Sequence, residues 1–197
     1  MPQRLTKLAR AAAAALALSA LPAAATTISE GSQPGGDFSS SFSAPTSIGS
    51  GIDLITGTTG STDRDFLVFT SMNPGAQTVT LSFSMPSASN PIGFAGGNVR
   101  YSFAPLPSAT GGTSLGGFFL TSTASTQTLT LNLGASFAGT LYLGINTLLG
   151  TNIGYSISAP GNVPAAPVPL PASAALLAGA LAGFGAMRAR KGKRSAA

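Results

Sequence analysis

Three residue types with distinctive chemistry are missing from this chain of 197 residues, which contains no cysteine, no histidine and no tryptophan. Without cysteine there is no disulfide framework, no thiol nucleophile and no thiolate metal site. Without histidine the chain lacks the commonest general base and the commonest metal ligand of proteins. Because these absences exclude most hydrolase constellations, we expect a protein that is not an enzyme and that needs no cofactor.

Charged residues are also scarce, at 8% of the chain, and the basic ones gather at its two ends. Between the ends only Arg64 and Arg100 are basic, so the middle is mildly acidic although the formal net charge is +5. A nucleic-acid site needs a basic patch that neutralises phosphates, so we expect no nucleic-acid partner. The terminal basic residues are Arg4, Lys7, Arg10, Arg188, Arg190, Lys191, Lys193 and Arg194.

Residues 1–25 have the order of a secretory signal peptide. A basic start precedes an apolar run over residues 11–21, which is too short to span a bilayer and ends at Pro22. Ala23 and Ala25 supply the small side chains of a cleavage site, so we expect signal peptidase to cut after Ala25. The alternative is a permanent N-terminal anchor. Under either interpretation we expect the secretion machinery to be a partner.

The C-terminal end contains three zones. Residues 161–171 are rich in proline and predict an extended linker. Residues 172–187 lack charge and proline and predict a transmembrane helix about 24 Å long, against roughly 30 Å of hydrocarbon. Residues 188–197 hold five basic side chains, which would stop transfer and leave this tail in the cytoplasm.

A short motif joins the linker to the apolar helix, and it consists of Val168, Pro169, Leu170, Pro171 and Ala172. With the helix and the basic tail behind it, this motif resembles the VPLPA variant of the PEP-CTERM sorting signal. The resemblance implies that an exosortase, a membrane-embedded cysteine transpeptidase, recognises and removes the tail. The protein would first be anchored in the inner membrane, facing the periplasm, and would then reach the cell surface or the medium. Such tails commonly occur in bacteria that make extracellular polysaccharide, which is a further expected partner.

The middle of the chain alternates polar and apolar residues with a period of two, as half-buried strands do. Residues 78–83, 129–133, 141–145 and 153–157 all follow this pattern, and turn residues such as Asn73-Pro74-Gly75 separate the runs. We expect an all-β domain over residues 37–160, an antiparallel β-sandwich or jelly roll of about eight short strands. Residues 26–36 are expected to be a flexible lead. The predicted signal helix and transmembrane helix flank this domain.

Two stretches in the first half of this region carry a second resemblance. Residues 63–69 read DRDFLVF and residues 74–81 read PGAQTVTL. This succession is similar to the acidic-aromatic strand and the following strand of bacterial pre-peptidase C-terminal domains. It implies a β-sandwich module.

Three carboxylates of the middle region, Asp53, Asp63 and Asp65, form its candidate metal site. Asp63 and Asp65 lie at the entrance of a predicted strand, where they and backbone carbonyls offer the oxygen ligands that Ca²⁺ requires. The alternative is a solubilising loop in which Arg64 pairs locally. A catalytic carboxylate pair is less consistent with the sequence, because residues two apart in a strand share one face, which we expect to point into solvent.

The aromatic residues of the middle region allow two readings. Exposed rings gathered in one patch would form a surface on which sugars stack, whereas buried rings would belong to the core of a sandwich. The second reading is the commoner fate of aromatic residues in a β domain. The residues concerned are Phe94, Tyr101, Phe103, Tyr142 and Tyr155.

The sequence therefore predicts an exported bacterial surface or matrix protein whose two ends carry sorting information and whose centre is the delivered domain. The domain would be structural or adhesive. One alternative is a stably anchored extracytoplasmic binding protein, specific for carbohydrate or dependent on calcium, whose tail is never removed. A second alternative is an enzyme with paired carboxylates in an open cleft.

Overall fold

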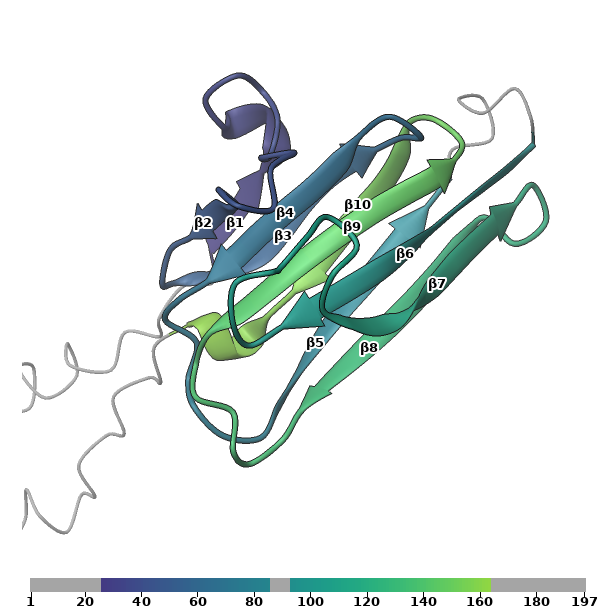
Figure 1. The fold of residues 1–197 in the computed structure, drawn as a ribbon. Helices are drawn as coiled ribbons and strands as arrows, with labels where there is room; N and C mark the ends of the chain where they lie inside the picture. Colours follow the sequence, from purple (N-terminus) through teal and green to yellow (C-terminus); the bar gives the residue numbers. More distant parts are fainter. Residues whose placement is uncertain (1–25, 86–92, 164–197) are drawn as a thin grey trace, which may run out of the picture. The chain divides into compact units, whose positions relative to one another are not determined.

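The computed structural model describes residues 26–85 and 93–163, which form a β-sandwich of two five-stranded sheets (Figure 1). The predicted signal peptide, the sorting motif, the apolar segment 172–187 and the basic tail lie outside the described residues. Within the described ranges, no helix has the length and apolar character needed to cross a membrane.

The first sheet, sheet A, has the strand order β1-β3-β10-β5-β8, and the second, sheet B, has the order β2-β4-β9-β6-β7. The strands of sheet A are β1 (Thr26–Ser29), β3 (Ile52–Thr59), β10 (Ile153–Ser158), β5 (Gln77–Ser84) and β8 (Thr126–Leu133). Those of sheet B are β2 (Thr46–Ile48), β4 (Arg64–Phe69), β9 (Leu141–Leu149), β6 (Phe94–Ser102) and β7 (Thr113–Thr121). Two short 3₁₀ helices, η1 (Glu30–Ser32) and η2 (Pro160–Asn162), complete the described structure.

Strands β3 to β10 are arranged as a jelly roll. In each sheet the first strand lies beside the last, because β3 pairs with β10 and β4 pairs with β9, while β5 pairs with β8 and β6 with β7. All these pairs are antiparallel, as a long hairpin rolled across two sheets requires. The all-β sandwich predicted from the alternating pattern is confirmed, and its strand order is that of the jelly-roll form.

Two strands were not expected, and both lie near the N-terminus. β1 pairs with β3 and β2 pairs with β4, in both cases in parallel, so the sheets are not purely antiparallel. The prediction that residues 26–36 form a flexible lead is wrong for 26–32, which contain β1 and η1, so the sandwich begins at Thr26 rather than Asp37. Each of the two strands has three or four residues and a single isoleucine, too little for an alternating pattern to be visible.

The alternation of polar and apolar residues in the sequence matches the burial of side chains in the structure. In β5, Val79, Leu81 and Phe83 are buried while the residues between them face outward. The ring of Phe83 stacks on that of Phe118 in the opposite sheet, with centroids 4.0 Å apart and planes 9° from parallel. Such contacts between the inner faces hold the two layers together.

The C-terminal end of the described structure is fastened to the sandwich through Asn162. This side chain is fully buried, and its Nδ2 donates hydrogen bonds of 2.7 Å to the carbonyl oxygens of both Gly49 and Ile52. One residue later, the Val163 carbonyl accepts a hydrogen bond of 3.0 Å from Asn73 Nδ2. The sandwich is therefore closed by side-chain contacts up to its last described residue.

Candidate metal centre

Four carboxylate side chains meet at one corner of the sandwich, where the chain passes from β3 in sheet A to β4 in sheet B. They belong to Glu30 in η1, Asp37 in the loop that follows, Asp63 in the β3–β4 connection and Asp65 in β4. One oxygen from each can be chosen so that all four lie within 4.8 Å of one another. The cluster thus unites the N-terminal segment with the β3–β4 corner.

Backbone and side-chain contacts hold two of these carboxylates in position. Glu30 Oε2 accepts a hydrogen bond of 2.6 Å from the backbone N–H of Thr58 and one of 3.0 Å from its hydroxyl. Asp63 lies in a tight turn in which its N–H donates to the Gly60 carbonyl over 2.9 Å. The Thr59 hydroxyl donates to the Asp63 carbonyl over 3.4 Å, which ties this turn to the end of β3.

Asp65 is the innermost member of the cluster. Its exposed fraction is 0%, and it lies on the same inward face of β4 as Leu67 and Phe69. Neither of its carboxylate oxygens has a hydrogen-bond partner among the described residues, nor has the Tyr155 hydroxyl nearby. The prediction that Asp63 and Asp65 both point into solvent is wrong for Asp65, because β4 is covered on both faces, which its sequence does not reveal.

The surroundings of Asp65 strongly favour its neutral form. Burial raises the pKa of Asp65 from 3.8 to about 8, and the charge of Asp63 adds to the shift. The hydroxyl of Tyr155 acts in the opposite direction, being close enough to stabilise the carboxylate without forming a well-aligned hydrogen bond. The pKa of Tyr155 is also raised, mainly by burial and to a smaller extent by the charge of Asp65.

The outer members of the cluster show the same tendency. Burial raises the pKa of Glu30, and the backbone N–H of Thr58 partly offsets this rise. Burial and the charge of Asp37 raise the pKa of Asp63, and a hydrogen bond from the backbone N–H of Arg64 partly offsets this rise. Within residues 26–85 and 93–163 the Arg64 side chain forms no ion pair, so it does not neutralise the cluster. An oxygen-only, negatively charged corner of this kind can hold a hard cation.

The predicted metal-site residues are thus divided by the structure. Asp63 and Asp65 come together, whereas Asp53 lies near the start of β3 and is not part of the cluster. Sequence reasoning missed Glu30 and Asp37, which lie far upstream, Glu30 within the predicted flexible lead and Asp37 at the predicted start of the β domain. One signal was available, because the chain has only five acidic residues in all.

The aromatic residues do not gather in one patch. Tyr155 is buried in the core, and Tyr101 is partly buried and packs against the edge of that core. Phe94 and Phe103 are exposed by 39% and 54%; Phe94 is the first residue of β6, and Phe103 follows its last residue. Their rings contact different neighbours, Phe119 in the first case and Tyr101 with Phe137 in the second. Tyr142, in β9, is partly buried.

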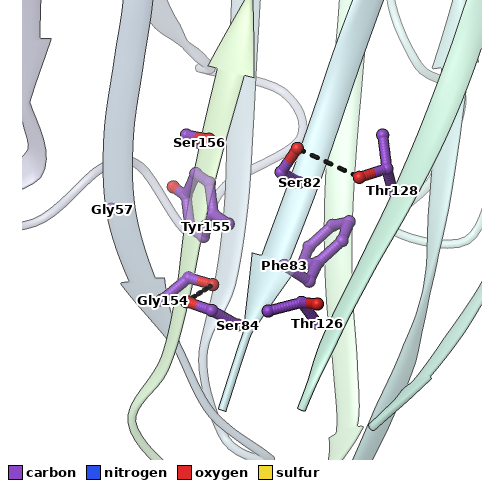
Figure 2. Close-up of a pocket in the computed structure, with 9 residues that line it drawn as sticks. All are labelled: Gly57, Ser82, Phe83, Ser84, Thr126, Thr128, Gly154, Tyr155 and Ser156. Carbon is purple, nitrogen blue, oxygen red and sulfur yellow. Dashed lines mark hydrogen bonds between the residues drawn. The ribbon is translucent and has the colours of Figure 1, made fainter. Parts of the chain in front are cut away.

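A shallow groove crosses the outer face of sheet A over β10, β5 and β8 (Figure 2). Its volume is about 410 Å³. Hydroxyl groups stand in a row across the neighbouring strands, because Ser156 pairs with Ser82 and Ser82 with Thr128. Ser82 and Thr128 hydrogen-bond to each other at 3.3 Å. The two aromatic residues at the groove, Phe83 and Tyr155, are buried and offer no exposed stacking face.

No protein-family model matches this chain, and no curated protein matches it either, so the sorting signal stays a prediction. Among solved structures, the chain is similar to a cycloisomaltooligosaccharide glucanotransferase from Paenibacillus sp., at 14% identity and a TM-score of 0.31, covering 49% of this chain and 13% of that one. It is also similar to CsCBM6-3 from Clostridium stercorarium, solved with cellobiose, at 15% identity and a TM-score of 0.30, covering 51% and 66%. The third is the pre-peptidase C-terminal domain of a collagenase from Bacillus anthracis, at 16% identity and a TM-score of 0.30, covering 57% and 91%. These likenesses are weak, and the jelly-roll order rests on the strand pairs themselves.

Proposed function

We propose that this chain is an exported surface or matrix protein whose β-sandwich is cargo and whose C-terminal segment is a sorting signal read by an exosortase. One structural observation supports this division most directly. The sandwich is closed at Asn162 and Val163, and the VPLPA motif begins only at Val168. Removal of the chain beyond the motif would therefore leave every described strand intact.

The same division accounts for the distribution of charge. Basic residues concentrate in residues 1–10 and 188–197, while the sandwich between them contains four of its carboxylates in one corner. A basic start and a basic stop are the topological signals of an exported, membrane-anchored protein. We infer that the delivered domain acts by binding or as a structural element and not by catalysis, since no histidine or cysteine is present to serve as base or nucleophile.

Two proline substitutions test the sorting proposal. In the bacterium that makes this protein, Pro169→Ala combined with Pro171→Ala should keep the protein in the membrane fraction with its basic tail attached. Pro164→Ala is the matched control, because this proline lies in the same linker but outside the motif. The wild-type and control proteins should lose the tail, as detected by an antibody against residues 188–197. Retention of the tail in all three proteins would contradict processing and favour a stably anchored binding protein.

The hydroxyl-lined groove favours a second candidate function, binding of an exopolysaccharide. Its ordered hydroxyl groups can donate to and accept from sugar hydroxyls, although no exposed ring is present there for stacking. Ser82→Ala with Thr128→Val should then weaken retardation of the protein in gels containing the bacterium's polysaccharide. Thr78→Val, on the same strand pair outside the groove, is the control. Equal mobility of all variants would exclude the groove as the sugar site.

A further inference from the structure

The acidic residues of this chain are few, and most of them converge. Only five are present in 197 residues, and four of the five lie in the corner cluster. Carboxylates that share a site repel one another, so such a grouping is unfavourable unless a proton or a cation joins it. The nearest basic residue in the sequence, Arg64, is exposed and forms no ion pair with another described residue.

A second observation points from the cluster to a ligand. Asp65 is completely buried, lies on the inward face of β4 and directs an unpartnered carboxylate at the other three acidic groups. The Tyr155 hydroxyl, on a residue that is 4% exposed, is likewise unpartnered and close to Asp65. Buried polar atoms of native proteins nearly always have partners, and a group without one commonly marks the place of an ion.

We propose that Glu30, Asp37, Asp63 and Asp65 bind one calcium ion, which joins the N-terminal segment to the β3–β4 corner. Four carboxylates carry eight oxygens, enough for the six to eight ligands that calcium takes. The ion would provide the counter-charge that the described residues lack. This inference does not depend on the sorting signal, since it concerns residues of the sandwich alone.

The number of carboxylates favours calcium over magnesium. Calcium takes six to eight oxygen ligands in a flexible geometry, whereas magnesium usually keeps several waters and is held by only one or two carboxylates. The four carboxylate oxygens of the cluster lie within 4.8 Å of one another, and two oxygens bound to one calcium ion at about 2.3–2.6 Å can be up to about 5.2 Å apart. Softer metals prefer nitrogen or sulfur ligands, and this chain has neither histidine nor cysteine.

Calorimetry and thermal unfolding test the site on the full chain, purified in mild detergent and stripped with EDTA. Calcium chloride should bind with a stoichiometry of one and raise the melting temperature by about 3–6 °C at ten or more times its dissociation constant. Magnesium chloride at the same concentration should give a much smaller rise. Neither heat nor a shift with calcium would overturn the proposal, as would equal shifts with both ions.

Substitutions at the outer part of the cluster separate a specific site from general acidity. Asp37→Asn with Asp63→Asn should weaken calcium binding about 100-fold or more, because two of the four carboxylates are lost. Neither residue belongs to the hydrophobic core, so the variant should still fold. Asp53→Asn removes one charge from β3 outside the cluster and should bind calcium as the wild type does. An equal loss in the control would contradict the assignment.

A luminescent probe reports the place of the ion. Terbium(III) replaces calcium at oxygen sites and emits when a nearby tyrosine transfers its excitation energy, and this chain has three tyrosines and no tryptophan. Tyr155→Phe should abolish most of the sensitised emission while terbium still binds, as shown by competition with calcium. Tyr101→Phe, two strands away from β4 in sheet B, should leave it unchanged. Emission lost in the control and kept in Tyr155→Phe would place the ion elsewhere.

Discussion

Tyr155 lies directly over Gly57, its partner in the neighbouring strand (Figure 2). A Cβ atom at Gly57 would be 2.5 Å from both the ring carbon CZ and the hydroxyl oxygen of Tyr155. No real Cβ atom has contacts this close, so the ring can occupy its place only because residue 57 has no side chain. The Tyr155 hydroxyl also lies close to Asp65 of the acidic corner. The close approach of the ring explains why a glycine stands in the middle of this strand.

Gly57→Ala should consequently destabilise the protein. The added methyl group must displace the buried Tyr155 ring, and overpacking of this kind costs about 1–3 kcal/mol of the free energy of unfolding. Urea unfolding of the full chain in mild detergent, followed by circular dichroism, measures the loss. Gly134→Ala is the control, because a Cβ there would meet nothing within 4 Å and the backbone is not left-handed. Equal stability of Gly57→Ala and wild type would contradict the close contact.

The metal-free protein should become less stable as the pH rises from about 4 to about 8. Asp65 has a pKa of about 8 in the folded state and 3.8 as its ordinary value, so the folded protein binds the extra proton in this window. Stability decreases with pH wherever the folded state binds more protons than the unfolded state. The groups that face Asp65 are Asp63, Glu30, Asp37 and Tyr155. With EDTA present, the melting temperature should fall by about 5 °C or more across the window.

Asp65→Asn tests the cause of that pH dependence. An amide is neutral at every pH and has nearly the shape of the protonated acid, so the variant should fold and lose most of the slope. The remaining dependence of stability on pH would come from Glu30 and Asp63, whose pKa values are raised as well. Asp53→Asn should show the wild-type profile. A slope unchanged by Asp65→Asn would show that its titration does not govern stability.

Asn162→Ala should loosen the C-terminal closure of the sandwich. The substitution removes two hydrogen bonds of 2.7 Å and leaves the carbonyl oxygens of Gly49 and Ile52 without this donor. The expected loss is about 2–4 kcal/mol in the free energy of unfolding. Asn132→Ala is the control, because Asn132 is exposed and its amide only accepts from Thr78, so its effect should stay below about 0.5 kcal/mol. Similar losses for both would contradict the closure.

Much of the fold was readable because long strands repeat their pattern. Val79, Leu81 and Phe83 alternate with hydroxyl residues, and the structure buries this set in β5. β1 and β2 escaped prediction because three or four residues with one isoleucine give no periodicity. Their parallel pairing depends on the path of the chain between the two sheets, which a local sequence pattern does not specify.

The acidic corner shows a different limit. Asp63 and Asp65 could be singled out because they are only two residues apart in sequence, but Glu30 reaches them only when β1 pairs with β3. Burial of Asp65 likewise depends on coverage of both faces of β4, which its own sequence does not state. Asp53 is also a carboxylate and lies in β3, the strand whose last residues lie beside the cluster. Because Asp53 is near the start of that strand, it lies at the opposite end from the cluster.

The central claim, that two processed ends flank a delivered sandwich, is tested most directly by the intact mass of the protein recovered from the surface of the cells that make it. The account predicts a chain that starts at Thr26 and lacks the basic tail, residues 188–197. A mass that includes residues 187–197 would contradict removal of the tail, and one that includes residues 1–25 would contradict cleavage of the signal peptide.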